Sequence, residues 1–249
     1  MATYVLSDIH GLIYKWHKML EKINFSKDDT LYIIGDVIDR GQFGIDIYKE
    51  IIKKPNIIVL KGNHELMMIE TIKKYIEKGC KSQDDLDGFT LDLWLNNGAH
   101  PTITSFMLLS KKEQKEIYEY IKKEDDYKFL TVNDKKYLLI HAGLYLHPNY
   151  TIEELLEKNI RKEDHLWIRE GFLESHQTIP DTTILFGHTM TSYIPEFIWS
   201  KDLMNDEQLE NCRKHRFYHG NQKIGIDCGC AGNYLLGCLR LDDMMEFYV

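Results

Sequence analysis

Short apolar runs alternate with polar stretches through the first quarter of the chain. Three of these runs, TYVL, TLYII and NIIVL, are rich in β-branched and aromatic residues, and each is followed by a glycine or a polar turn. Runs of this length bounded by turns are typical of buried parallel strands. Between the first two, Ile13, Trp16, Leu20 and Ile23 recur at three- and four-residue spacing, which predicts an amphipathic helix. The pattern therefore predicts strand–helix–strand units.

Helical and strand-like segments continue along the rest of the chain. IDIYKEIIKK predicts a helix that Pro55 ends, and ELMMIETIKKYIEKG predicts another with Gly79 as its C-cap. Residues 80–128 contain no strong strand, and SKKEQKEIYEYIKKE predicts a helix with Ser110 as N-cap. Strands resume in KKYLLIHAG, TTILFGH, KIGIDCG, YLLGCLRLDD and MEFYV, of which the last are expected to be antiparallel. This order predicts an α/β protein with two packed mixed β-sheets flanked by helices.

The composition favours a single domain over residues 1–249. A chain of 249 residues with 43% hydrophobic residues is long enough to bury a substantial core. The sequence contains no Gly/Ser-rich or Pro-rich linker, no internal repeat and no low-complexity tract. We expect residues 80–128 to form a helical insertion near the mouth of the functional site.

Charge and hydropathy exclude several kinds of partner. A formal net charge of −8 argues against a nucleic-acid partner, because such binding depends on lysines and arginines that displace counterions. The chain opens directly into a strand and has no apolar run near the ~20 residues that a membrane span needs, so we expect a soluble, cytoplasmic protein without a membrane partner. The five cysteines, three of them Cys228, Cys230 and Cys238, lack zinc-finger spacing and are expected to be reduced thiols.

Polar side chains follow five of the predicted strands, at the point where each strand ends. Asp8 and His10 are two residues apart, so they lie on the same side and can bind one ion through a carboxylate and an imidazole. The other four strand ends carry Asp36, Asn63, His141 and His188. One such residue alone is often a turn cap or a hydrogen-bonded histidine. Five strand ends with oxygen or nitrogen ligands predict a metal site, because such side chains converge in the crevice beyond the strand ends of an α/β sheet.

The residue types also indicate which chemistry this site performs. Carboxylate, imidazole and amide ligands without thiolate suit ions such as Mn²⁺, Fe or Zn²⁺. Two divalent ions about 3.5–4 Å apart lower the pKa of a bridging water and clamp the attacking and leaving oxygens of an in-line displacement. A serine or cysteine nucleophile is then not required. The pattern thus predicts hydrolysis of a phosphate ester.

Further residues near these strand ends fit acid catalysis and phosphate binding. His64 directly follows Asn63, and Asp39 lies three residues beyond Asp36, so the two form a candidate acid and its orienting carboxylate. Taken alone, His64 is equally well an ordinary histidine at a helix N-terminus. Arg40 is the first candidate for clamping the phosphoryl group, because a guanidinium matches two phosphate oxygens.

The motif order SDIHG, GDVIDRG, GNHE, HAG and GH resembles the metallophosphoesterase superfamily, and within it the phosphoprotein phosphatase family. The resemblance runs from Asp8 to His188 and implies a four-layer α/β/β/α sandwich. It implies that Asp8 and His10 bind the first metal, Asp36 bridges both metals, and Asn63, His141 and His188 bind the second. It implies His64 and Asp39 as catalytic residues, and Arg40, Asn63 and Arg169 as phosphate-binding residues. Manganese is the expected metal, with iron, zinc, nickel and cobalt as alternatives. For Arg169 in LWIRE, a surface arginine paired with Glu170 is the competing interpretation.

Two departures from the motifs of eukaryotic family members indicate which branch of the family the chain resembles. The fourth motif is HAG rather than the HGG of many eukaryotic members, and IDCGCAGNYLLGCLRL resembles the bacterial branch. That stretch lacks the longer eukaryotic C-terminal loop motif, so no regulatory subunit is inferred.

Three functions remain in competition at this point. The segment WLNNGAHPTIT resembles the WLxNGG segment of bacterial and phage protein-phosphatase-like members, which favours a serine/threonine protein phosphatase. The alternative is a symmetrical bis(5'-nucleosyl)-tetraphosphatase, which would need an aromatic platform for a base. Its candidate aromatic residues are Trp94, Phe106, Tyr145 and Trp199. A non-catalytic metal-binding scaffold is the third, but such a scaffold typically has a broken ligand set, and here every ligand is present.

Overall fold

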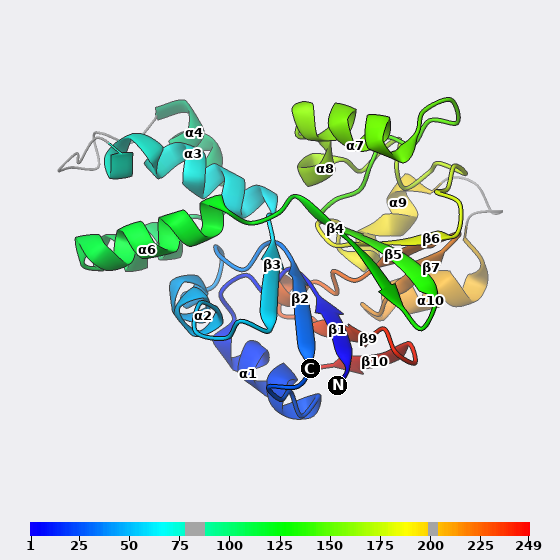
Figure 1. Cartoon of the computed structure of the whole chain (residues 1–249), viewed down its shortest axis with the longest axis horizontal. Helices are drawn as coiled ribbons and strands as arrows, with labels where there is room; N and C mark the ends of the chain where they lie inside the picture. Colours follow the sequence, from blue (N-terminus) through cyan, green and yellow to red (C-terminus); the bar gives the residue numbers. More distant parts are fainter. Residues whose placement is uncertain (78–87, 199–203) are drawn as a thin grey trace.

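The computed structural model of this chain describes residues 1–77, 88–198 and 204–249 (Figure 1). Its strands are β1 (Thr3–Leu6), β2 (Thr30–Ile34), β3 (Ile57–Leu60), β4 (Tyr127–Val132), β5 (Lys135–Ile140), β6 (Thr182–Phe186), β7 (Tyr218–Gly220), β8 (Lys223–Gly225), β9 (Gly237–Arg240) and β10 (Met245–Tyr248). Its α-helices are α1 (Ile13–Lys22), α2 (Gly44–Ile51), α3 (Asn63–Glu77), α4 (Gly88–Asn96), α5 (His100–Met107), α6 (Lys111–Lys122), α7 (Ile152–Arg161), α8 (Asp164–Trp167), α9 (Ile194–Phe197) and α10 (Asp206–Arg213).

Within the described residues the strands form two mixed five-stranded sheets. The first has the order β10-β9-β1-β2-β3, with β1, β2 and β3 parallel and β9 and β10 antiparallel. The second has the order β4-β5-β6-β8-β7, with β5, β6 and β8 parallel and the two outer strands antiparallel. Each sheet therefore presents the carboxyl ends of three parallel strands at one edge.

Alternating side chains of each strand enter two different cores, which produces four layers. Tyr4 and Leu6 of β1 face the helices that cover the first sheet, whereas Val5 faces the second sheet. In β5, Leu138 and Ile140 face the helices over the second sheet, and Leu139 faces the first sheet. Strands buried on both faces read as continuous apolar runs, which explains why these runs lack a strict polar alternation. Helices α1, α2, α3 and α6 flank the first sheet, and α7 to α10 flank the second (Figure 1).

The predicted fold class is confirmed, including the antiparallel strands β9 and β10 near the C-terminus. Ser110 caps α6 as predicted, with a reciprocal capping box to Glu113. The described part of residues 80–128 forms α4, α5 and α6, and the predicted cap Gly79 lies outside the described residues. Strands β4 and β7 were not predicted. Both are outer strands of the second sheet, so they pack against a neighbour on one side only and need fewer apolar residues.

None of the described helices combines the length and apolar character needed to cross a membrane. The four cysteines within the described residues, Cys212, Cys228, Cys230 and Cys238, are buried free thiols. Burial raises the pKa of Cys230 to about 12, so this thiol is protonated at neutral pH.

Candidate functional site

The loops that follow β1, β2, β3, β5 and β6 meet at one edge of the two sheets. They carry Asp8 and His10, Asp36, Asn63, His141 and His188 respectively, as the sequence predicted. All of these side chains except that of His188 are at least 98% buried. Backbone hydrogen bonds join the first two loops, since the amides of His10 and Gly11 donate to the carbonyls of Asp36 and Val37 at 2.9 and 2.8 Å. The backbone that carries these polar side chains is thus itself fixed by hydrogen bonds.

The backbone of the site is strained at several positions. Asp8, His10, Asp36 and His188 have φ values between 48° and 62°, a left-handed region that residues with a side chain rarely adopt. Such conformations each cost on the order of 1–3 kcal/mol and persist where surrounding contacts enforce them. Gly11 leaves no room for a side chain, because a Cβ there would lie 2.5 Å from the carbonyl oxygen of Gly41. The loops are therefore shaped to aim these side chains inward.

Asp36 is the centre of the site. Its Oδ2 lies 3.6 Å from Nε2 of His10 and 3.8 Å from Nε2 of His64, and its Oδ1 lies 3.4 Å from Nε2 of His141. Burial alone would raise the pKa of Asp36, but the imidazoles around it outweigh burial and lower that pKa below its usual range. Asp36 is therefore a carboxylate anion that can be shared between two groups of ligands.

Asn63 joins the two histidines of the second sheet. Its Oδ1 lies 2.9 Å from Nε2 of His141 and 3.1 Å from Nδ1 of His188. Nδ1 of His141 donates to the carbonyl oxygen of Ile34 at 2.8 Å when it carries the ring proton. That bond leaves Nε2 as a free lone pair directed at the site, which is the arrangement typical of a metal-ligating histidine.

Asp8 sits beside a second carboxylate. Its two oxygens accept from the backbone amide of His188 at 3.2 and 3.1 Å. Burial, together with the neighbouring charges of Asp227 and Asp36, raises the pKa of Asp8 well above its usual range. No described lysine or arginine forms an ion pair with Asp8 or Asp36. Three clustered carboxylates without such a partner are the electrostatic arrangement that a bound cation stabilises.

The donor groups are close enough together for metal ions. His10, Asp36 and His64 form one set whose candidate ligand atoms all lie within 4.8 Å of one another, and Asp36, His141 and His188 form a second such set. Asp36 belongs to both. Nε2 of His188 is a buried nitrogen without a hydrogen-bond partner among the described residues. Nitrogen and oxygen donors of this kind fit two divalent ions that share Asp36.

His64 is held by a carboxylate that the helical segment 88–107 fixes in place. Nδ1 of His64 donates to Oδ2 of Asp39 at 2.6 Å, and Nε1 of Trp94 donates to the same oxygen at 2.6 Å. The backbone amide of Asp39 donates to Oγ1 of Thr102 at 2.9 Å, and that of Arg40 donates to the carbonyl oxygen of Gly98 at 2.9 Å. Burial alone would lower the pKa of His64, but Asp36 and Asp39 outweigh it and raise that pKa. The raised pKa favours the protonated form of His64, and Asp39 orients its ring, as an acid requires.

The two predicted phosphate-binding arginines line one cavity of about 260 Å³ beside His188. Arg40 is exposed, and its Nη2 lies 3.4 Å from Nε2 of His64. Arg169 also lines the cavity and forms no ion pair with Glu170 within the described residues. Burial lowers the pKa of Arg169, although Asp227 and Asp8 act in the opposite direction. Two guanidinium groups therefore face the cavity next to the metal-ligand cluster.

Two residues of the site were not singled out from the sequence, and a third has another contact than the one expected. Glu65, the last letter of GNHE, accepts from the amides of Asp36, Val37 and Gly62 at 2.8, 3.0 and 3.1 Å, and burial and Asp36 raise its pKa to about 7. Asp227 follows β8, so the rule that found the other strand-end residues would also have found it. Burial raises the pKa of Asp227 to about 6. Trp94 was considered as packing or as a base platform, whereas the structure shows it as the partner of Asp39.

The aromatic platform that was considered for a nucleotide base is absent at two of its four candidate positions. Trp94 and Phe106 are buried in the core, with at most 1% of their surface exposed, so a base cannot stack on them. Tyr145 is 51% exposed but does not line the cavity, and Trp199 lies outside the described residues. Tyr193, which is 49% exposed and lines the cavity, was not considered.

Sequence relatives with curated names fall into two groups. The chain is 29% identical over 224 residues to serine/threonine-protein phosphatase 2 of Escherichia coli, a match that covers 86% of this chain and 91% of that protein. It is also 29% identical over 168 residues to the symmetrical bis(5'-nucleosyl)-tetraphosphatase of Wigglesworthia glossinidia brevipalpis, covering 67% of this chain and 53% of that protein. The chain thus spans about half the length of its tetraphosphatase relatives.

Solved structures share the fold at low sequence identity. A crystal structure of a candidate diadenosine tetraphosphatase aligns with a TM-score of 0.61 at 15% identity, covering 99% of this chain and 92% of that one. A protein serine/threonine phosphatase of Saccharomyces cerevisiae aligns with a TM-score of 0.56 at 15% identity, covering 100% of this chain and 79% of that one. The sequence model of the family described as calcineurin-like phosphoesterase matches residues 1–216. The chain therefore belongs to the calcineurin-like phosphoesterase family and is a hydrolytic phosphoesterase.

Proposed function

We propose that this chain is a serine/threonine protein phosphatase that hydrolyses phosphomonoesters with two divalent metal ions. The observation that carries the two-metal proposal is Asp36, which lies in both sets of candidate ligands and is surrounded by imidazoles from both sheets. Membership of the family implies divalent metal ions. Asp8 and His10 would hold the first ion, Asn63, His141 and His188 the second, and Asp36 both. We propose manganese as the metal.

The bound ions would supply an activated water and neutralise charge on the phosphoryl oxygens. The protein groups around them divide the remaining work. Arg40 and Arg169, which both line the cavity, would bind the non-reacting phosphoryl oxygens, and Asn63 would add an amide contact. His64, whose Nδ1 is held by Asp39, would transfer a proton from Nε2 to the leaving oxygen. Protonation of a poor leaving group by a positioned side chain is typically worth 10²–10⁴ in rate.

The extent of the sequence matches supports a phosphoprotein substrate. The phosphatase relative aligns over nearly its whole length, whereas the tetraphosphatase relative aligns over about half. The segment that distinguishes protein-phosphatase-like members contributes Trp94, Gly98 and Thr102, and all three contact the loop that carries Asp39 and Arg40. This segment therefore shapes the catalytic loop itself. We propose a phosphoserine or phosphothreonine side chain as the substrate.

A symmetrical dinucleoside tetraphosphatase remains the second candidate, because Tyr193 offers a partly exposed ring in the cavity beside Arg40 and Arg169. The test is to load purified protein with Mn²⁺ and measure initial rates on a phosphothreonine peptide and on diadenosine tetraphosphate under the same conditions. Asp36→Asn serves as the inactive control. Faster release of inorganic phosphate from the peptide supports the proposal. Faster release of two ADP molecules per dinucleotide contradicts it in favour of the second candidate, and no activity on either by metal-loaded protein contradicts both.

A further inference from the structure

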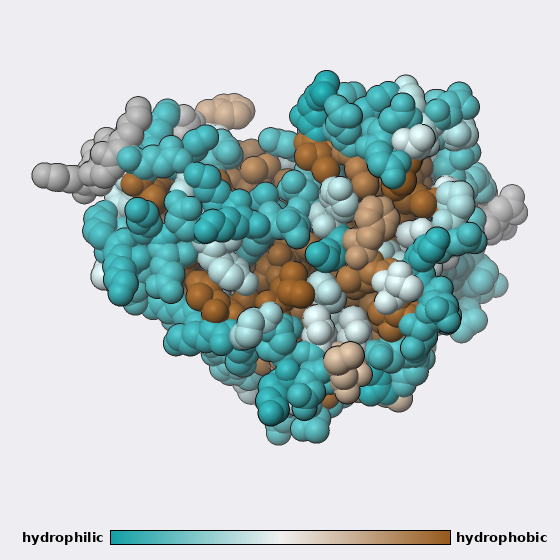
Figure 2. All heavy atoms as spheres, viewed as in Figure 1, coloured by the Kyte–Doolittle hydropathy of each residue, from teal (hydrophilic) through white to brown (hydrophobic). Residues whose placement is uncertain are grey.

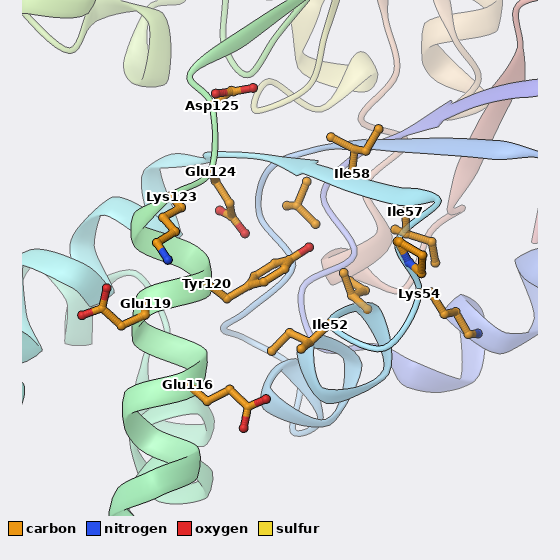
Figure 3. A pocket seen from close by; sticks show the side chains of 13 residues that line it. Ile52, Lys54, Ile57, Ile58, Glu116, Glu119, Tyr120, Lys123, Glu124 and Asp125 are labelled. Carbon is orange, nitrogen blue, oxygen red and sulfur yellow. The ribbon is translucent and has the colours of Figure 1, made fainter.

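A second cavity, of about 590 Å³, lies apart from the catalytic site and shares no lining residue with the cavity there. It lies between the end of α2, strand β3 and the C-terminal half of α6 (Figure 3). Its apolar lining consists of Ile51, Ile52, Ile57, Ile58, Val59 and Tyr120. Figure 2 shows apolar atoms gathered over β3 next to the hydrophilic surface of α6. A water-exposed hollow lined by aliphatic side chains is suited to binding another apolar group.

The cavity runs along an outer edge of the first sheet. Strand β3 is the last strand of that sheet within the described residues. The carbonyl of Asn56 accepts from Leu31 on the β2 side, whereas the amide of Lys61 donates to Asp125 on the outer side. Because successive residues of a strand turn their backbone groups to opposite sides, Ile57 and Val59 share the outer side with Lys61. On this side the amide of Ile57 already donates to the carbonyl of Lys54, and the carbonyl of Val59 takes part in the bridge to Asp125. The carbonyl of Ile57 and the amide of Val59 are left facing the cavity.

The outer edge of β3 already accepts a strand partner at one end. Asp125, which follows α6, forms a parallel bridge with Leu60. The segment before Asp125 belongs to α6 and diverges from the sheet, which leaves the edge at Ile57–Val59 without a strand beside it in the described structure. An extended peptide of about four residues, at roughly 3.3 Å per residue, would continue this pairing along β3.

The charged groups at this cavity favour a basic occupant. Glu124 is 92% buried, and its Oε1 accepts from the hydroxyl of Tyr48 at 2.9 Å, whereas its Oε2 has no hydrogen-bond partner among the described residues. Burial is the main reason that the pKa of Glu124 is raised well above its usual range. Figure 3 shows the carboxylate of Glu124 beside the ring of Tyr120, which reaches from α6 toward β3, while Lys54 points away. Glu116, Glu119 and Asp125 add further carboxylates to the lining, against two lysines, Lys54 and Lys123, so the lining carries more acidic than basic side chains.

We propose that this groove binds an extended segment of a partner protein, which adds a strand to the outer edge of β3 and places a lysine or arginine beside Glu124. Aliphatic side chains of the segment would fill the space between Ile57, Val59 and Tyr120. The backbone pairing supplies affinity for any extended chain, and Glu124 selects for a basic residue. The proposal does not depend on which phosphoester the catalytic site hydrolyses.

The probe is a fluorescein-labelled peptide of sequence acetyl-Gly-Ile-Val-Lys-Val-Ile-Gly-amide, with a second peptide that has glutamate in place of lysine. Binding to the full chain is measured by fluorescence anisotropy. We expect saturable binding of the lysine peptide and at least about tenfold weaker binding of the glutamate peptide, as for the loss of one charged hydrogen bond. Glu124→Gln, which keeps an acceptor for Tyr48, should weaken the lysine peptide about tenfold. Glu70→Gln is the matched control, because Glu70 is an exposed glutamate that does not line the cavity.

Hydrogen exchange, catalytic activity and a second variant distinguish loss of peptide binding from loss of the fold. Hydrogen exchange of the segment containing Val59 should slow when the lysine peptide binds, because its outward amide gains a partner. Hydrolysis of p-nitrophenyl phosphate by Glu124→Gln should match the wild type. Should that variant fail to fold, Tyr120→Ala removes the apolar wall and should weaken both peptides. The absence of saturable binding, equal losses in Glu70→Gln and Glu124→Gln, or displacement of the peptide by inorganic phosphate would each overturn the proposal.

Discussion

The two sheets contribute unequal halves of the catalytic site. The first sheet supplies contiguous motifs whose loops are bound to one another, as when the amide of Gly41 donates to the carbonyl of His10 at 3.0 Å. The buried carboxylate of Glu65 then accepts hydrogen bonds from four backbone amides of this half. The second sheet supplies single residues, His141 and His188, each at the end of one strand. The first half is therefore preorganised by its own contacts. The second half has a backbone bond from the amide of Gly187 to the carbonyl of His141, and in addition it is tied to the first half through Ile34 and Asp8.

This difference predicts where substitutions act on chemistry and where they act on binding. Residues of the first half hold the shared ligand and the acid, so their loss should reduce kcat. Arg169 belongs to the second half and lies in the loop after α8, so its loss should chiefly weaken substrate binding. The expected effects decrease from Asp36, which joins the two halves, to Lys223, which supports the Arg169 loop from within β8.

Replacing Asp36 should have the largest effect, because it is the carboxylate common to both ligand sets. We expect Asp36→Asn to retain little bound metal and to lose on the order of 10³-fold or more in kcat, since metal-ion catalysis contributes several kcal/mol. Metal content by mass spectrometry of the purified protein checks the first result, and steady-state rates check the second. Two equivalents of metal in a folded Asp36→Asn protein would falsify the bridging role.

His64→Asn should reduce kcat by roughly 10²–10⁴. The reason is that His64 is proposed to protonate the leaving oxygen, and its Nδ1 partner Asp39 keeps it oriented. The metal content should stay unchanged, because Asp8, His10 and Asp36 are the proposed ligands of the first ion and His64, although near them, is not. The measurement compares phenyl phosphate with p-nitrophenyl phosphate, whose leaving group needs no proton. The loss should be much smaller for p-nitrophenyl phosphate, and an equal loss on both substrates is incompatible with the acid role.

Most of the first half could be predicted from the sequence, because each of its side chains directly follows a strand and sits in a contiguous motif. The residues that hold these loops and side chains in place were harder to predict. Glu65 was visible as a letter of GNHE, but its role depends on amides 28 and 29 residues away. Trp94 meets Asp39 across 55 residues of chain, and nothing in the local pattern near Trp94 encodes that distance. A side chain whose partner is set by tertiary packing leaves no periodic signal in the sequence.

In the second half, too, the candidate ligands could be predicted from the sequence, whereas the residue that supports the Arg169 loop could not. His141 and His188 were predicted, because each follows an apolar strand. Lys223, whose side chain holds the loop that follows Arg169, was not predicted. Lys223 sits inside β8 as a buried lysine, which sequence patterns assign to a solvent-facing position. The outer strands β4 and β7 were missed for a related reason, since the neighbours that stabilise them are distant or arrive later in the chain.

Trp94→Phe should test whether the helical segment supports the acid. The variant removes the indole donor to Asp39 but keeps an aromatic ring, so we expect kcat to fall about tenfold, as for the loss of one charged hydrogen bond. Phe106→Leu is the matched control, because Phe106 is also buried in this segment and its side chain makes no polar contact. Thermal unfolding reports the packing cost of each variant. If Phe106→Leu lowers kcat as much as Trp94→Phe, the effect comes from packing and not from the contact with Asp39.

Arg169→Ala should act mainly on binding. Removing one of the two guanidinium groups that line the cavity should raise KM for the phosphoester by roughly tenfold, as charged hydrogen bonds are worth about 1.5–3 kcal/mol. Metal content should not change, because Arg169 is in neither ligand set. Inhibition by inorganic phosphate should weaken in parallel. Wild-type values of KM and kcat in this variant would contradict the phosphate-binding role and favour the interpretation of Arg169 as a surface arginine.

The smallest expected effect is at Lys223, which supports the Arg169 loop from within β8. Its Nζ donates to the carbonyls of Phe172 and Ser175 at 2.6 and 2.7 Å, three and six residues beyond Arg169. Lys223→Met removes both bonds, so we expect KM to rise a few-fold, roughly threefold, with kcat nearly unchanged. A kcat that falls together with kcat/KM would show that Lys223 supports the chemistry of the first half, and the proposed division between the halves would then be wrong.

The pH dependence of unfolding provides an independent check on Lys223. Burial lowers its pKa from 10.5 to about 8, so between these two values the unfolded chain binds more protons at this site than the folded chain does. Stability contributed by this site therefore rises with pH from about 8 to about 10.5 and does not change below that window. The free energy of unfolding of the wild type minus that of Lys223→Met, both measured in urea, should be more positive at pH 10 than at pH 8. An unchanged difference would mean that Lys223 is ionised to the same degree in both states, and the buried anchor of the Arg169 loop would have to be abandoned.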